Sequence, residues 1–271
     1  MAGGSLAPAL DLCLLHSPEE INRKYFCVVF VEAYRISSQA TQNLARFTLH
    51  LIGERKMKCE QPTKPVIQTK KSQAKMTPGQ ALELLKAGNE RFVNGCMVNR
   101  DLREQVSATA GGQYPYTAIL SCQDSRTSSE VLFDLNKGDA FSIRIAGNIV
   151  NEDVLGGLEF STKLMGAKLI AVIGHTRCGA IRGAIDSEEL GNLTALLGRI
   201  NPAVESALDG RRRDSSDSKL VEEVAKANVL LAMRQIRDRS PIIRDMVEAE
   251  QVGLVGGMYN LATGKVTFYG N

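Results

Sequence analysis

Lys-Leu-Ile-Ala-Val-Ile-Gly-His-Thr-Arg-Cys-Gly, at residues 168–179, is the most informative stretch of the chain. Its first six residues include an unbroken apolar run of strand length, which is typical of a parallel strand covered on both faces. Potential ligands, His175 and Cys178, follow within a few residues. This combination predicts a layered α/β domain, because such domains bind their ligands beyond the carboxyl ends of the strands.

The segments on either side alternate between strand and helix. We predict four further strands, at residues 116–121, 140–145, 252–259 and 265–269. Helices are predicted at residues 127–135, 152–165, 220–239 and 241–249, and Asn151 can cap the second of them. The expected fold is α/β, with a mostly parallel central sheet of four parallel strands plus an antiparallel edge strand, flanked by helices.

The N-terminal part has a different composition. Residues 1–53 contain short apolar stretches without a sustained period, so we predict only an extension of unassigned structure. Residues 54–75 carry seven Lys or Arg against two Glu and predict a basic linker. Thr77-Pro78 is a typical helix start, residues 103–109 predict a second helix, and the folded domain is expected at residues 76–271.

The overall composition excludes some classes of partner. With 33 basic and 30 acidic side chains, the chain is too balanced to favour nucleic acid. No apolar run approaches the roughly 18 residues of a membrane span. Six widely spread cysteines lack the spacing of a disulfide scaffold and favour a reducing compartment. We expect a cytoplasmic protein, with an organellar or exported form left open by the unassigned N-terminal residues.

Three potential metal ligands are predicted to converge. Cys122 directly follows the predicted strand at residues 116–121, while His175 and Cys178 follow the strand at residues 168–173. Two thiolates and an imidazole suit zinc, and three protein ligands leave a fourth tetrahedral position open. Two alternatives remain at this point: a closed structural zinc site, for which no convincing fourth Cys or His is found, and two buried core cysteines beside a hydrogen-bonded histidine.

Asp124 and Arg126 follow Cys122 on the turn between strand and helix. A carboxylate and a guanidinium at this spacing can pair through two hydrogen bonds. Held by Arg126, Asp124 could accept a hydrogen bond from zinc-bound water, and once released it could occupy the open position on the metal. The alternative is an ordinary surface ion pair, worth about 0–1 kcal/mol.

Together these motifs resemble the signature of the β-class carbonic anhydrases. That signature is Cys-x-Asp-x-Arg followed by His-x-x-Cys-Gly, found here at residues 122–126 and 175–179. The resemblance runs from about Thr77 to the end of the chain and includes Arg-Ile-Ala-Gly-Asn at residues 144–148. One branch of the family carries a Trp three residues before the first zinc cysteine, in an inhibitory bicarbonate site. Ile119 stands there in this chain, which favours the plant-like branch.

The resemblance implies roles for particular residues. It implies one Zn²⁺ per subunit held by Cys122, His175 and Cys178, with Asp124 and Arg126 as the catalytic pair. It also implies a substrate pocket that includes Gln113, Phe141, Ala146 and Gly179. Homodimers or higher homo-oligomers are expected, with the N-terminal helices packing on a partner subunit.

The implied activity is the reversible hydration of carbon dioxide to bicarbonate and a proton by zinc-bound hydroxide, with the Asp–Arg pair controlling the open position. Two thiolates cancel the charge of Zn²⁺, so activity is expected to rise into the alkaline range. Two alternatives are a carbonyl sulfide or carbon disulfide hydrolase on the same scaffold, and a non-catalytic zinc-stabilised assembly module. The Gly-x-Gly-x-x-Gly motif that would follow a strand in a dehydrogenase is missing, and so is the His-x-Glu motif of zinc deaminases.

Overall fold

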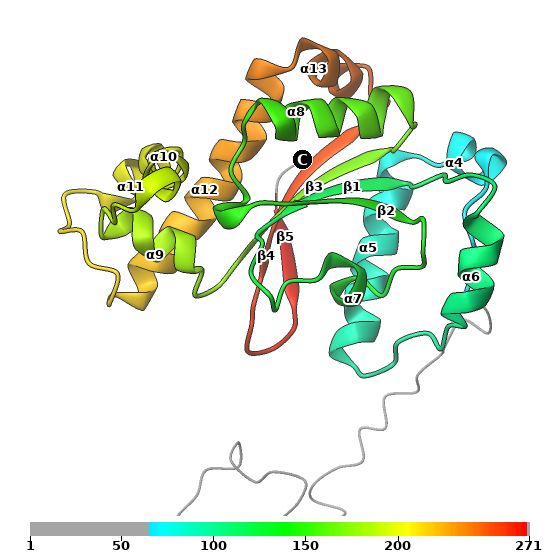
Figure 1. Cartoon of the computed structure of the whole chain (residues 1–271), viewed down its shortest axis with the longest axis horizontal. Coiled ribbons are helices and arrows are strands. Elements are labelled where there is room, and N and C mark those ends of the chain that lie inside the picture. Colours follow the sequence, from blue (N-terminus) through cyan, green and yellow to red (C-terminus); the bar gives the residue numbers. More distant parts are fainter. Residues whose placement is uncertain (1–64, 270–271) are drawn as a thin grey trace, which may run out of the picture. The chain divides into compact units, whose positions relative to one another are not determined.

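The computed structural model of the chain describes residues 65–269 (Figure 1). The predicted extension at residues 1–53 and the first half of the predicted linker, residues 54–64, lie outside these residues. Within the described part, none of the helices combines the length and the apolar character that crossing a membrane requires.

A five-stranded sheet forms the centre of the domain. Its strands are β1 (Thr117–Ser121), β2 (Ala140–Arg144), β3 (Leu169–His175), β4 (Gly253–Tyr259) and β5 (Val266–Tyr269). They lie in the order β2-β1-β3-β4-β5. The first three neighbouring pairs are parallel, and β4 pairs with β5 in antiparallel orientation. The predicted fold class is therefore confirmed.

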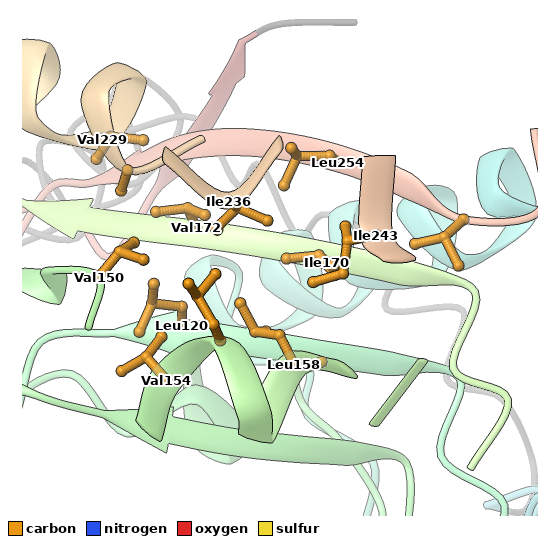
Figure 2. Packing of buried hydrophobic residues seen from close by; sticks show 14 residues of the cluster. Leu120, Val150, Val154, Leu158, Ile170, Val172, Val229, Ile236, Ile243 and Leu254 are labelled. Atoms are coloured by element: carbon orange, nitrogen blue, oxygen red, sulfur yellow. The ribbon is translucent and has the colours of Figure 1, made fainter. Parts of the chain in front are cut away.

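Helices cover both faces of this sheet. On one face, Leu120, Ile170 and Val172 meet residues of α8 (Glu152–Glu159), α12 (Ser218–Arg239) and α13 (Pro241–Glu248), as Figure 2 shows. On the other face, Ile119 and Ile173 pack with residues of α5 (Pro78–Val93) and α7 (Ser129–Leu132). All seven residues of β3 are buried, because each face of this strand has a covering layer.

Side-chain caps fix the starts of two helices where the sequence predicts them. The Thr77 hydroxyl accepts a hydrogen bond from the Gln80 N–H, and Pro78 opens α5. Asn151 Oδ1 accepts a hydrogen bond from the Val154 N–H at the start of α8. Such caps satisfy N–H groups that have no partner within the helix.

Two predicted helices are shorter than expected. The helix predicted at residues 127–135 is reduced to α7, because the chain turns at Asp134, whose φ is +48° and whose carboxylate binds Arg91 and Arg100. The helix predicted at residues 152–165 leaves α geometry after Glu159 and continues as a π-helical turn, Phe160–Leu164. Neither ending is marked by a Gly or Pro that the sequence would reveal.

Three short helices between β3 and α12 were not predicted. They are α9 (Gly179–Ile185), α10 (Gly191–Gly198) and α11 (Asn201–Leu208). They gather beside α12 at one side of the sheet (Figure 1) and share an apolar cluster with it. Each has eight residues or fewer, and Gly191, Gly198 and Pro202 interrupt the periodic pattern by which longer helices are predicted.

The end of the predicted linker is part of the folded domain. Residues Lys70–Lys75 form helix α4, capped by Thr69. Gln73 in this helix is buried, and its amide donates to the carbonyls of Pro115 and Met165 at 2.7 and 2.8 Å. The linker interpretation is wrong for these residues, because one buried amide docks the helix although its other residues are mostly polar. Helix α6 (Leu102–Thr109) follows α5, as predicted.

A buried carboxylate makes the stability of this domain pH-dependent. Asp139 Oδ2 accepts hydrogen bonds from the Asn136 backbone and side chain, but Oδ1 is buried without a partner. Burial raises the pKa of Asp139 to about 6. Compared with an unfolded pKa of about 3.9, this shift is worth about 3 kcal/mol. The stabilisation is fully present below about pH 4 and is lost as the pH rises through about 6.

Asp139→Asn is therefore expected to remove the fall in stability that accompanies ionisation of Asp139 at rising pH. Relative to the parent chain, the variant should gain about 1 to 2 kcal/mol in free energy of unfolding between pH 5 and pH 8. Urea denaturation at several pH values measures the difference. Parallel pH curves for the two proteins would contradict the assignment.

Candidate metal centre

The three predicted ligands lie at the carboxyl edge of the sheet. Cys122 directly follows β1, His175 is the last residue of β3, and Cys178 immediately precedes α9. β1 and β3 are neighbours in parallel register, with Ser121 opposite Ile173. Residues far apart in the sequence are thereby brought to one point, as predicted.

The ligand atoms are close enough to hold one metal ion. Cys122 Sγ and Cys178 Sγ are 3.9 Å apart, and the ligand atoms of the three residues lie within 4.8 Å of one another. Two Zn–S bonds of about 2.3 Å at a tetrahedral angle would place the sulfurs about 3.8 Å apart. All three residues are buried, and no fourth Cys or His within residues 65–269 joins the group.

The His175 ring is held by a hydrogen bond that leaves Nε2 available. Its Nδ1 lies 2.9 Å from the Thr176 carbonyl oxygen, so Nδ1–H donates and Nε2 keeps its lone pair. Nε2 is buried and has no hydrogen-bond partner. A buried nitrogen without a partner is costly in a folded protein. Because it sits beside two sulfurs, a bound metal ion fits this site.

The two thiols interact directly with one another. A hydrogen bond from the Cys178 thiol, together with contacts from His175 and the Gly147 N–H, lowers the pKa of Cys122 well below its usual range. The same hydrogen bond and burial raise the pKa of Cys178. The opposite directions of the two shifts agree with one thiol proton lying between the two sulfurs, which are 3.9 Å apart. A divalent cation would replace that proton, because thiolates are the metal-binding form.

Asp124 and Arg126 form the predicted two-point ion pair beside the three ligands. Arg126 Nε and Nη2 donate to the two carboxylate oxygens at 2.9 and 2.7 Å. These hydrogen bonds hold the pKa of Asp124 well below its usual range. Asp124 Oδ2 lies 4.0 Å from His175 Nε2. The carboxylate is thus at the edge of the site but restrained by the guanidinium.

Two residues that sequence reasoning missed hold the turn between Cys122 and Asp124. The Thr127 hydroxyl is 2.9 Å from both the Cys122 and the Asp124 carbonyl oxygens. Arg144, at the end of β2, donates to the same two carbonyls at 3.2 and 2.6 Å. Its role follows from β2 lying next to β1, and the order of strands in the sheet was not predicted.

A further backbone contact reaches the Cys122 sulfur. The Gly147 N–H donates to Cys122 Sγ at 3.4 Å. Gly147 has a φ of +66°, and a Cβ on it would lie 2.7 Å from Ile200 Cδ1. Only glycine can therefore bring its N–H to this place without strain.

Comparisons with known proteins agree with this site. A family model described as "Carbonic anhydrase" matches residues 117–266, which include the three ligands and the Asp–Arg pair. The chain belongs to the β-carbonic anhydrase family. "Carbonic anhydrase 2" of Mycobacterium tuberculosis is 33% identical over 193 residues, which cover 69% of this chain and 91% of that protein.

Solved β-carbonic anhydrases share the fold. The structure of the β-carbonic anhydrase CcaA is 26% identical with a TM-score of 0.55, covering 71% of this chain and 94% of that one. A structure from Sordaria macrospora, described as one of two tetrameric β-carbonic anhydrases, has a TM-score of 0.57 at 21% identity. It covers 62% of this chain and 91% of that one.

The four predicted substrate residues of this β-carbonic anhydrase fall into two groups. Ala146 precedes Gly147, and Gly179 opens α9 next to Cys178, so both lie beside the ligands. Phe141 instead is partly buried and packs against the core cluster that includes α8, edge-on to Phe160. Gln113 is exposed on the segment that enters β1 at its amino end, opposite to the end where Cys122 lies.

Proposed function

We propose that this chain binds one Zn²⁺ through Cys122, His175 and Cys178 and catalyses the reversible hydration of carbon dioxide. The observation that carries the proposal is the buried group of three ligands with Asp124 beside it, held back by Arg126. When bound, zinc would lower the pKa of a water molecule and so supply the nucleophile near neutral pH.

The protein groups around the ligands have separate tasks in this proposal. The ionised Asp124 accepts a hydrogen bond from the attacking water and orients it. Arg126 fixes the carboxylate through two hydrogen bonds and keeps it from filling the open position. Arg144 and Thr127 hold the Cys122–Asp124 turn, so the carboxylate keeps its distance from the His175 ring.

The three-ligand set argues against a purely structural zinc site. Closed zinc sites use four protein ligands, whereas catalytic sites keep a position for water. Asp124 is the carboxylate next to this position, and both of its oxygens are already bound by Arg126. The non-catalytic assembly module is therefore the weaker candidate.

A hydration assay on the full zinc-loaded chain tests the activity. We expect stopped-flow measurements to show carbon dioxide hydration that rises by at least about tenfold between pH 7 and pH 9, as for one group titrating near pH 8 or above. The reason is that two thiolates leave the zinc less acidifying than three imidazoles, whose zinc-bound water has a pKa near 7.

Carbonyl sulfide hydrolysis, measured on the same preparation, distinguishes a carbonic anhydrase from the main alternative, a carbonyl sulfide hydrolase. A higher kcat/KM for carbonyl sulfide than for carbon dioxide would favour the hydrolase. Hydration no faster than in buffer, in a preparation with full zinc content, would overturn the proposed activity.

We also propose that the active form contains at least two copies of the chain. Gln113 and Phe141, which the family resemblance assigns to the substrate pocket, lie away from the three ligands of their own chain. A second copy could bring these side chains to the site. Light scattering on the same preparation tests this, and a fully active monomer would contradict it.

A further inference from the structure

We propose that Asn228 is a positioning residue for the metal site, which acts through Gly147 on the sulfur of Cys122. This inference rests on the proposed metal binding, but its test does not require that the chain hydrate carbon dioxide. Asn228 lies in α12, 81 residues further along the chain than Gly147.

Asn228 interrupts an otherwise apolar buried stripe. The other buried residues of α12 are Leu220, Val221, Val224, Ala225, Val229, Ala232 and Ile236. Asn228 is only 2% exposed, and its Nδ2 donates to the Gly147 carbonyl at 2.6 Å. Burying an amide is costly unless it is hydrogen-bonded. An apolar residue would continue the stripe, so packing alone does not explain an asparagine here.

The bonded carbonyl and the sulfur-binding N–H belong to the same residue. Gly147 accepts from Asn228 through its carbonyl and donates from its N–H to Cys122 Sγ at 3.4 Å. Its positive φ and the closeness of Ile200 require glycine, which is also the most flexible residue type. Asn228 supplies the restraint that a side chain on Gly147 cannot provide.

The restraint matters because the N–H···S hydrogen bond orients a metal ligand. Residues that hold ligands from behind typically change metal affinity by about 10- to 100-fold when mutated. Asn228→Leu keeps the branched shape and the number of heavy atoms of the side chain but removes the donor. Gly147 is then free to turn, and its N–H no longer stays directed at Cys122 Sγ.

The experiment measures zinc affinity of the full chain by competition with a chelator. We expect Asn228→Leu to weaken zinc binding by about tenfold or more. In the cobalt-substituted protein, the sulfur-to-cobalt charge-transfer band should shift, because a hydrogen bond to one sulfur is lost. Asn228→Asp gives a second variant: its carboxylate oxygen would face the Gly147 carbonyl without donating, so affinity should fall as well.

Asn89→Leu is the matched control. Asn89 is also buried, in α5, and its amide donates to the Leu132 and Gly264 carbonyls at 3.1 and 2.9 Å. Its loss should lower thermal stability while zinc affinity and the cobalt spectrum remain unchanged.

Three outcomes decide the proposal. Weaker zinc binding in both Asn228 variants, with normal binding in Asn89→Leu, supports it. Parent-like affinity and spectrum in Asn228→Leu overturn it, as does an affinity loss of equal size in Asn89→Leu, which would indicate general destabilisation. A parent chain that binds zinc tightly but does not hydrate carbon dioxide refutes the proposed activity alone.

Discussion

Arg126→Ala is expected to lower kcat/KM for carbon dioxide hydration by at least about 100-fold while zinc content stays at one per chain. Losses of this size are typical when a preorganised electrostatic contact is removed from an active site. Arg126 binds both oxygens of Asp124, and Asp124 Oδ2 already lies 4.0 Å from His175 Nε2. Without the guanidinium, the carboxylate can turn and compete with water for the open position.

Two further variants separate this mechanism from simple loss of charge. Arg126→Lys keeps the positive charge but cannot make the two-point contact, so it should recover little activity. Adding Asp124→Ala to Arg126→Ala should lower kcat/KM only a little further, because the effects of substituting residues that act as a unit are not additive. Stopped-flow rates and metal analysis measure both effects. A near-normal rate in Arg126→Ala would refute the role given to the pair.

The core of the fold is predictable because its signals are local. Residues 169–173 form an unbroken apolar run, and the structure buries all of β3 beneath helices on both faces. Thr77 and Asn151 mark the starts of α5 and α8, since their side chains bond the first N–H groups of these helices. Both signals act within a few residues, so the sequence displays them directly.

The features that were missed depend on distant contacts. Helix α4 is docked by one amide of Gln73, which binds carbonyls 42 and 92 residues away. Helix α7 ends where Asp134 meets Arg91 and Arg100. No local sequence pattern predicts such partners, because only the tertiary structure brings them together.

The same distinction holds at the candidate site. The convergence of Cys122, His175 and Cys178 could be predicted, as could the Asp124–Arg126 pair, because each motif lies at the end of a recognisable strand. Arg144 and Asn228 could not, since both act on backbone atoms that only the sheet order and helix packing bring near. Asn228 did leave one signal, a lone polar residue in the apolar stripe of a helix.

Cys178→Ser is expected to abolish stoichiometric zinc binding and, with it, carbon dioxide hydration. The hydroxyl of serine does not ionise near neutral pH and is a harder donor than a thiolate, so one of three protein ligands is lost. Zinc-site free energies of about 10–16 kcal/mol for four ligands imply roughly a 100- to 1000-fold weaker affinity per ligand.

Thermal unfolding with and without zinc provides the internal control for this variant. A ligand that binds only the folded state raises its stability according to concentration and affinity. Zinc should therefore raise the melting temperature of the parent chain but not that of Cys178→Ser, while the two metal-free proteins melt at similar temperatures. Cys122→Ser should behave in the same way, because the two sulfurs are equivalent ligands of one ion. If either variant kept both tight zinc binding and hydration, that cysteine would not be a ligand, and the site would need a different donor.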